Sequence, residues 1–295
     1  MTTRRIALAL QGGGAHGAFT WGVVDRLLEE DVEIVSVSGV SSGAILGTVL
    51  VQGLAEGGVP AARKAMRQLW MKVAHAQALH PWLWGWDFLW GSDILWQGFE
   101  ATMRLFSPSL LNPSGHAPLR KLLESVVRRE LLNDWNAPQL TVSATDVQTG
   151  EAVLFDNVAI DVDILLASAC LPFVFPPVEI GDRAFWDGAY SRNPPLQPLL
   201  WPLPPDEIVL VRALPMRRGD VPRSATEIFN RLNELACASA LEAELALLPK
   251  SIRLVTYADE DELAAQPISS KVLVGEARLT ALFEAGRRAA PHVRA

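Results

Sequence analysis

The sequence predicts an α/β protein, a three-layer α/β/α sandwich around a mostly parallel sheet. Two short apolar runs, 6–10 and 32–38, each end at a glycine and lead into a segment with helical character, at 20–28 and 44–51. The runs are continuously apolar, which is typical of strands that are covered on both faces. The repeated order of strand, tight turn and helix therefore indicates parallel strands between two layers of helices.

The rest of the chain extends this pattern with two hairpins and further helices. We expect hairpins where Thr149 and Gly150, and then Gly181 and Asp182, separate short apolar runs, because these residues favour tight turns. The other expected elements are helices at 61–78, 118–131, 225–248 and 272–288 and strands at 139–146, 152–156, 178–180, 184–186, 208–212 and 252–257.

We expect a single domain over residues 1–295. A chain of this length with 49% hydrophobic residues can bury one large core. In this interpretation the motifs described below occupy a core at about 5–200, and residues 60–135 form a helical, tryptophan-rich, cap-like insertion. Residues 201–295 add the strands and helices that complete the fold.

The charge and the cysteine content narrow the range of partners. The formal net charge is −7 and no run of Lys and Arg could follow a phosphate backbone, so nucleic acid is not expected as a partner. The two cysteines, Cys170 and Cys237, are too few for a disulfide framework and lack metal-ligand spacing. We therefore expect a cytoplasmic protein with no metal and no cofactor.

Residues 82–96 hold five of the ten tryptophans, mixed with leucine, isoleucine and phenylalanine. Two interpretations are open. The segment is either a cap that admits acyl chains or touches a membrane surface peripherally, as amphipathic indole rings do, or a tryptophan-rich packing layer. Two aspartates interrupt it, and it is shorter than the roughly 20 residues that span a bilayer. The apolar run at 6–10 is too short for a signal peptide, so no transmembrane segment is expected.

The strongest local signal is the Gly-x-Ser-x-Gly pentad at 39–43, between an apolar strand and a helix of small apolar residues. At a sharp strand-to-helix turn a serine hydroxyl projects out of the sheet, and the flanking glycines Gly39 and Gly43 relieve crowding. The N-terminus of the next helix stabilises developing negative charge. This placement predicts Ser41 as a nucleophile; the alternative interpretation is a glycine-serine turn without chemistry.

A second cluster of glycines lies at 12–17, again between a strand and a helix. Consecutive glycines let backbone N–H groups converge on an anion, which could be a nucleotide phosphate or a tetrahedral oxyanion. Gly12, Gly14 and Gly17 match the dinucleotide fingerprint. A dinucleotide site also needs an acidic residue at the end of the next strand, but that strand ends in Ser38 and turns into the pentad. The oxyanion interpretation is therefore favoured.

A third signal is Asp187, which follows a short expected strand and precedes Gly188 and Ala189. Alone it is weak, because most Asp-Gly pairs are surface turns. A glycine-rich loop, a Gly-x-Ser-x-Gly elbow and a late Asp-Gly-Ala motif, in this order, resemble the patatin-like phospholipases. The resemblance covers roughly the first 200 residues and extends to the segments 144–146, 149–151, 168–172 and 175–177.

The resemblance implies a patatin-like fold and a Ser-Asp dyad in which Asp187 is the base for Ser41. It also implies that N–H groups of the loop hold the oxyanion, those of Gly12, Gly13 and Gly14. The residues that support the motifs are Gly17, Gly39, Ser42, Gly43, Gly188 and Ala189. A free aspartate, with a pKa of about 3.9, matches a serine hydroxyl poorly, so burial or a short hydrogen bond must raise the basicity of Asp187.

The positions of the histidines favour a dyad over a triad. In an α/β-hydrolase triad the histidine follows the acid, and only His292, near the end of the chain, follows Asp187. His16 stands where the family commonly has arginine, and we expect it to brace the glycine-rich loop. The other histidines are expected to be surface or packing residues, namely His75, His80 and His116.

We therefore expect a metal-independent lipid acyl hydrolase that cleaves carboxylic esters, such as phospholipids or lysophospholipids, through an acyl-enzyme. A catalytically idle lipid-binding or regulatory protein with the same fold is the alternative, and a nucleotide-dependent enzyme is a third candidate. The presence of both Ser41 and Asp187 favours the hydrolase.

Overall fold

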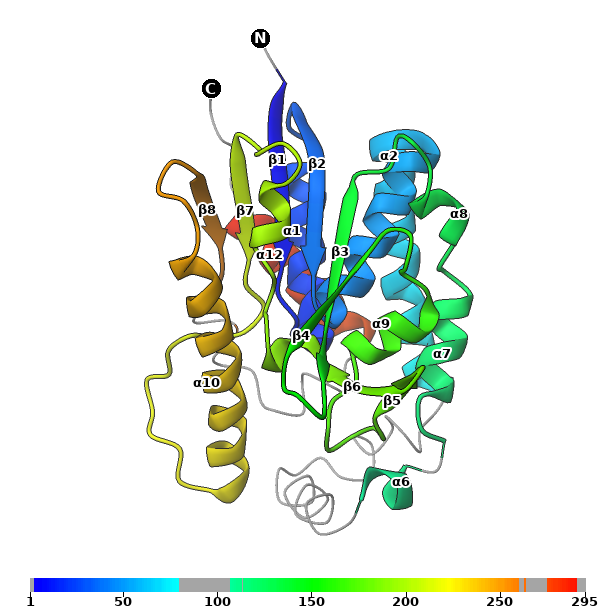
Figure 1. Ribbon diagram of the computed structural model, residues 1–295, viewed down its shortest axis with the longest axis vertical. Coiled ribbons are helices and arrows are strands. Elements are labelled where there is room, and N and C mark those ends of the chain that lie inside the picture. Colours follow the sequence, from blue (N-terminus) through cyan, green and yellow to red (C-terminus); the bar gives the residue numbers. More distant parts are fainter. Residues whose placement is uncertain (1–2, 80–106, 113, 260–262, 264–274, 291–295) are drawn as a thin grey trace.

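The structure is a computed structural model that describes residues 3–79, 107–112, 114–259, 263 and 275–290 (Figure 1). One eight-stranded sheet crosses the molecule in the order β5-β6-β3-β2-β1-β7-β8, and β4 pairs with β3. The strands are β1 (Arg4–Leu10), β2 (Val32–Gly39), β3 (Gln139–Asp146), β4 (Ala152–Asp156), β5 (Val178–Ile180), β6 (Arg183–Asp187), β7 (Glu207–Val211) and β8 (Arg253–Tyr257). Neighbouring strands from β3 through β8 on the main path are parallel, whereas β4, β5 and β6 pair antiparallel.

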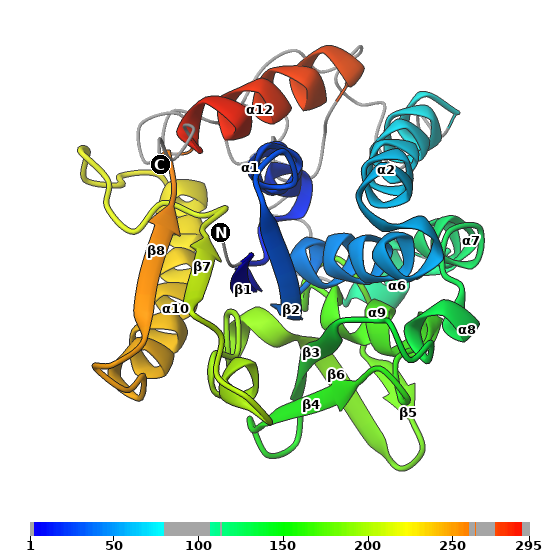
Figure 2. The same ribbon diagram turned by 90° about the horizontal axis from the view of Figure 1, so that it is seen from above.

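Helices cover both faces of this sheet (Figure 2). The helices are α1 (Gly17–Leu27), α2 (Ser42–Leu79), α6 (Pro108–Leu111), α7 (Ala117–Glu124), α8 (Arg129–Leu132), α9 (Val162–Ser168), α10 (Ala225–Ala246) and α12 (Glu276–Ala289). Three 3-10 turns are η1 (Gly14–His16), η2 (Gly188–Tyr190) and η3 (Gln197–Leu200). In Figure 2, α1, α2 and α12 lie on one side of the central strands and α10 lies on the other.

Strand β1 divides its side chains between two cores. Ile6, Leu8 and Leu10 face the large core that α1, α2, α9 and α12 complete. Ala7 and Ala9 face a second core with residues of β7, η3 and α10. A strand buried on both faces in this way confirms the three-layer α/β/α fold and explains why the run at 6–10 is continuously apolar.

The two expected hairpins are confirmed. β3 and β4 pair antiparallel around Gly150, and β5 and β6 pair antiparallel around Gly181. Both glycines have positive φ, 74° and 65°, which is the left-handed conformation that such turns require.

The structure corrects one of the expected helices and confirms two others. The expected helix at 118–131 is two helices, α7 and α8, because Arg128 between them is extended. The helices expected at 44–51 and 61–78 are the two parts of α2, separated by a kink where Gly57 and Gly58 leave helical geometry. Helix α9 was not expected, because seven mostly apolar residues do not reveal a period that separates a helix from a strand.

Among the residues that the structure describes, helix α2 is the one element that has the length and hydropathy of a membrane span, over Ser42–Ala76. Half of its most apolar window is buried inside the protein. The kink at Gly57 and Gly58 leaves about 15 straight residues before it, fewer than the roughly 20 that cross a bilayer. Its apolar composition is accounted for by its place in the core.

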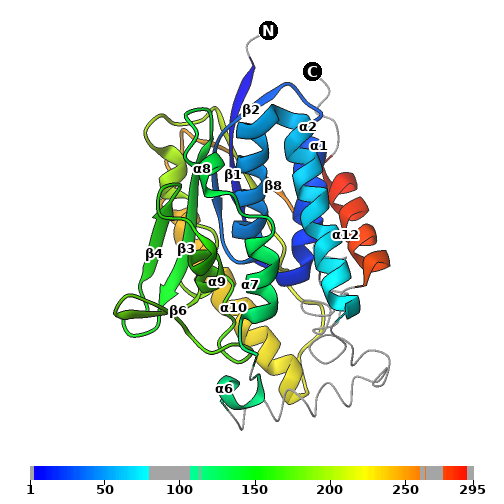
Figure 3. The same ribbon diagram turned by 90° about the vertical axis from the view of Figure 1, so that its right-hand side faces the viewer.

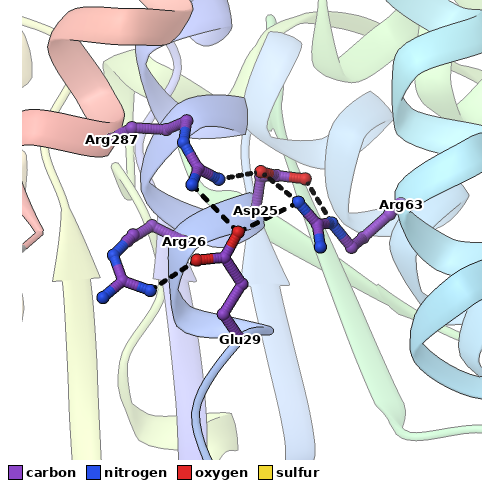
Figure 4. A network of polar contacts seen from close by, with 5 residues as sticks. All are labelled: Asp25, Arg26, Glu29, Arg63 and Arg287. Carbon is purple, nitrogen blue, oxygen red and sulfur yellow. Dashed lines mark hydrogen bonds and ion pairs between the residues drawn. The ribbon is translucent and has the colours of Figure 1, made fainter. Parts of the chain in front are cut away.

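The C-terminal helix α12 packs directly against α1 (Figure 3). The two backbones touch at glycines: a Cβ at Gly22 would lie 2.0 Å from the Phe283 carbonyl oxygen, and one at Gly286 would lie 2.0 Å from that of Phe19. An ion network next to this contact joins α1, α2 and α12 (Figure 4). The helix that follows the glycine-rich loop is therefore held by the far end of the chain.

Candidate active site

The pentad forms a sharp turn between β2 and α2. Ser41 has φ of 54°, and among the described residues it is the one non-glycine residue with positive φ. The Val40 N–H donates to Leu10 O at 3.3 Å, and the Gly43 N–H donates to Val40 O at 2.8 Å. A left-handed conformation costs about 1–2 kcal/mol for a residue with a Cβ, and such strain is concentrated at functional sites. The local geometry is that of a nucleophile elbow.

A second element fixes the backbone of this turn. The Ser41 N–H donates to the Ser168 hydroxyl at 2.9 Å, and Ser168 is buried at the end of α9. No role for Ser168 was predicted from the sequence. The one indication in the sequence that Ser168 belongs to the site is its place at the start of the segment 168–172. Ser168 is also the last residue of α9, a helix that was not predicted.

Asp187 lies at the end of β6 and is 1% exposed. Its carboxylate accepts a hydrogen bond from the Ala189 N–H at 2.9 Å, and the Ser41 side chain lies close enough to lower its pKa. Its main chain is also fixed, because its N–H donates to Cys170 O at 2.9 Å and its carbonyl accepts from the Thr145 hydroxyl at 2.8 Å. The structure thus brings together the two residues that the sequence predicted as a pair, 146 positions apart.

Burial raises the pKa of Asp187 to about 7, against the lowering effect of the hydrogen bonds from Ala189 and Ser41. Within the described part of the chain, no Lys or Arg forms an ion pair with this carboxylate. Asp146, on the neighbouring strand, differs: Arg183 donates to it at 2.6 Å and holds its pKa below the usual value. Asp187 therefore has the raised basicity that a partner for a serine hydroxyl requires.

The glycine-rich loop lies beside the nucleophile, and its three N–H groups differ. A Cβ at Gly12 would lie 2.9 Å from the Ser41 Cβ. The Gly12 N–H donates to Asn193 Oδ1 at 3.0 Å, and the Gly13 N–H donates to the Ser42 hydroxyl at 3.2 Å. Gly14 has φ of 59°, and no described residue accepts a hydrogen bond from its N–H. Asn193 is buried and follows the Asp-Gly-Ala motif by four residues. Its role as the acceptor for the Gly12 N–H was not predicted from the sequence.

Two side chains tie the loop to the segment after β7. His16 is buried and its Nδ1 lies 3.3 Å from Ala213 O. Gln11 Oε1 accepts from the N–H groups of Ala213 and Leu214, at 3.0 and 3.1 Å. The contact of His16 with Ala213 is consistent with the expected role of His16 in bracing the loop. The role of Gln11 in the same link was not predicted.

The supporting motif residues all lie at close contacts. A Cβ at Gly17 would lie 2.9 Å from the Ser42 hydroxyl oxygen. A Cβ at Gly39 would lie 2.6 Å from the Gly43 carbonyl oxygen. At Gly43 and Gly188 the obstacle is main chain, the Leu10 carbonyl oxygen at 2.3 Å and that of Ser143 at 2.2 Å. Ala189 packs in a small cluster with Val40, Leu214 and Cys237.

Metal binding and cysteine chemistry have little support among the residues that the structure describes. They contain no group of three or more His, Cys, Asp or Glu side chains that could hold a metal. Cys170 and Cys237 are both buried and neither forms a disulfide bond, and burial raises the pKa of the Cys170 thiol to about 12. The tryptophan-rich segment at 82–96 lies outside the described residues.

Comparison with known proteins agrees with the motifs. The family model of patatin-like phospholipases matches residues 8–200. Uncharacterized NTE family proteins of Mycobacterium tuberculosis and Mycobacterium bovis are 28% identical over 199 residues, which are 66% of this chain and 45% of theirs. The match thus spans less than half the length of these relatives. The chain belongs to the patatin-like phospholipase family.

Solved structures with some similarity come from bacterial and human proteins. VipD of Legionella pneumophila has a TM-score of 0.44 at 15% identity, covering 97% of this chain and 67% of its own. Human GIVD cytosolic phospholipase A2, in complex with methyl gamma-linolenyl fluorophosphonate, has a TM-score of 0.47 at 12% identity, covering 98% and 57%.

Proposed function

We propose that this protein is a lipid acyl hydrolase that cleaves carboxylic ester bonds with Ser41 as nucleophile and Asp187 as base. The observation that carries the proposal is the pairing of Ser41, on a strained turn, with the buried carboxylate of Asp187, whose pKa burial raises to about 7 while the Ser41 side chain acts to lower it. Membership of the patatin-like phospholipase family supports a lipid ester as the substrate class, with phospholipids and lysophospholipids as the first candidates.

The reaction follows from these two groups. Asp187 accepts the hydroxyl proton as Ser41 Oγ attacks the ester carbonyl, which forms a tetrahedral intermediate. The intermediate collapses, Asp187 returns the proton to the departing alkoxide, and the acyl group stays on Ser41. Water then attacks the acyl-enzyme with Asp187 again as base, which releases the carboxylic acid and restores the hydroxyl.

We further propose that Gly14 is the first donor to the oxyanion. Its N–H has no acceptor among the described residues, whereas those of Gly12 and Gly13 already donate to Asn193 and Ser42. Gly12 adjoins Ser41. Its N–H would be a second donor if it left Asn193 Oδ1 and donated to the substrate oxygen instead. A backbone donor of this kind contributes roughly 10²–10³ in turnover.

Hydrolysis of p-nitrophenyl esters of graded chain length tests the proposal. We expect Ser41→Ala and Asp187→Ala to lose activity by about 10³-fold or more, because each removes one member of the dyad. Asp182→Asn, at the exposed turn of the β5–β6 hairpin, is the matched control and should keep full activity.

A fluorophosphonate probe that reacts with activated serines separates the hydrolase from a catalytically idle lipid-binding protein. The wild type should be labelled at Ser41, and Ser41→Ala should not. Equal ester turnover in all variants, together with no labelling, would rule out the hydrolase and leave the lipid-binding alternative.

A further inference from the structure

Helix α10 exposes large apolar side chains on its outward face, and on its inward face it buries two carboxylates next to Cys237 and Leu241. Its outward face carries Ile228, Leu232 and Leu235, which are 44%, 59% and 45% exposed and recur at a spacing of four and three residues. Its inward face buries Glu234 and Glu244. Amphipathic helices normally bury the apolar stripe and expose the carboxylates. We define these three outward residues as the α10 stripe.

The inward polar residues fix this orientation. Glu234 accepts from Arg218 at 2.7 and 2.8 Å and from Asn230 at 2.8 Å. Glu244 accepts from the Leu196 N–H at 2.7 Å. Rolling the helix to hide the stripe would break these charge-assisted hydrogen bonds, each worth about 1.5–3 kcal/mol, and would expose the buried Leu241. The stripe is therefore held toward the outside.

The inward face of α10 also contacts the candidate active site. Cys237 packs with Val40 of the elbow and with Ala189, and the Tyr190 hydroxyl donates to Asn233 Oδ1 at 3.3 Å. Phe229 meets Phe173 edge-on at 5.1 Å, and Phe173 is itself exposed. In Figure 1 the N-terminal half of α10, drawn in yellow, extends past the lower ends of the strands, the same end at which β2 turns into Ser41.

The surroundings of the stripe combine apolar and cationic groups. Residues 212–235 contain five arginines and three acidic residues, in a chain whose net charge is −7. A cavity of about 480 Å³ adjoins Leu235 and is lined in part by Met216, Arg212, Arg217 and Glu242. Apolar side chains that enter an acyl layer, bordered by guanidinium groups at phosphate depth, are typical of proteins that lie on phospholipid surfaces.

We propose that the α10 stripe is the surface by which this protein docks on a phospholipid surface, with the arginine-lined cavity facing the headgroups. This inference rests on the proposed function in one respect, since the phospholipid surface on which the protein docks also supplies its lipid substrate. Docking through α10 brings the end of the sheet that carries Ser41 to the membrane, so that a lipid ester can reach the nucleophile.

Vesicle binding by an inactive protein tests this separately from catalysis. Ser41→Ala protein is floated with vesicles of phosphatidylcholine containing phosphatidylglycerol, with and without the added pair Ile228→Ser and Leu232→Ser. We expect the added pair to weaken binding by about tenfold or more, since it removes two large apolar side chains from the contact. Leu247→Ser, 61% exposed at the end of the same helix but outside the stripe, is the matched control and should bind normally.

Two further readouts complete the test. In the active protein, the Ile228→Ser and Leu232→Ser pair should leave hydrolysis of a short soluble ester unchanged while vesicle hydrolysis falls. Equal vesicle binding with and without the pair, or no binding by the parent protein, would overturn the proposal. A dimer that the pair converts to monomer would also overturn it, because a second copy of this chain would then cover the stripe.

Discussion

Two buried aspartates in this protein have opposite surroundings. Asp187, beside Ser41, accepts a hydrogen bond from the Ala189 N–H, and burial raises its pKa to about 7. Asp25, on α1, accepts from two arginines, Arg63 of α2 at 2.7 and 3.0 Å and Arg287 of α12 (Figure 4). The first lies at the candidate active site and the second joins three helices.

The difference shows what each carboxylate is suited to do. A buried carboxylate with two guanidinium partners on other helices forms ion pairs that hold those helices together. A buried carboxylate without a cation has a raised pKa and takes a proton readily. Glu29 extends the first arrangement, because a hydrogen bond from Arg287 holds its pKa below the usual value.

The largest expected effect is on catalysis. Asp187→Asn should lower kcat/KM for a soluble ester by about 10³-fold or more, because the amide cannot accept the serine proton. Asp25→Asn should leave kcat/KM per folded molecule unchanged. Comparable activity losses in the two variants, measured at a temperature where both are folded, would remove the distinction between the two sites.

The next effect is on stability. Asp25→Asn should lower the free energy of unfolding by about 2 kcal/mol, because it weakens the charge-assisted hydrogen bonds of a buried carboxylate to Arg63 and Arg287, although Glu29 keeps an ion pair with each arginine. Urea denaturation measures this. Glu56→Gln is the control, since it removes an Arg-carboxylate pair of the same chemistry, with Arg128, from an exposed position and should produce no resolvable change.

A smaller effect concerns the pH dependence of the reaction. Asp187 must be ionised to act as the base, so kcat/KM should rise about tenfold per pH unit up to a pH near 7 and then level off. A profile that stays flat down to pH 5 would mean that a group with an ordinary carboxylate pKa, or none, limits the rate.

The smallest effect is a gain in stability. The folded-state pKa of Asp187, about 7, lies above its ordinary value of 3.8, so the folded protein holds this proton more tightly than the unfolded chain. The stabilisation from Asp187 is therefore fully present below pH 4 and is lost as the pH rises through 7. At pH 8, Asp187→Asn should unfold with a free energy about 2 kcal/mol higher than the wild type, and at pH 4 the difference should shrink.

Much of the fold and the identity of the motifs followed from local sequence. The strand–turn–helix at Ser41 and the hairpin turns at Gly150 and Gly181 were predicted because apolar runs and turn residues act over a few positions. The fold class followed because continuous apolar strands need cover on both faces. Helix α9 was missed since its seven residues carry no readable period.

Contacts between distant positions were beyond such patterns. The acceptor for the Gly12 N–H, Asn193, lies 181 positions away, and the hydroxyl that holds the Ser41 N–H, that of Ser168, lies 127 positions away. The orientation of α10 also depends on contacts of this kind, because Glu234 accepts a hydrogen bond from Arg218 and Glu244 accepts one from the Leu196 N–H.

The sequence alone determined which residues are the candidates for the chemistry and the order of strands and helices that presents them, because backbone preference and apolar spacing are short-range properties. Only the tertiary structure decided that Asp187 is buried without a cation while Asp25 is buried with two. The reason is physical: a carboxylate's pKa is set by the burial and the charges around it, and these come from segments that only folding brings together.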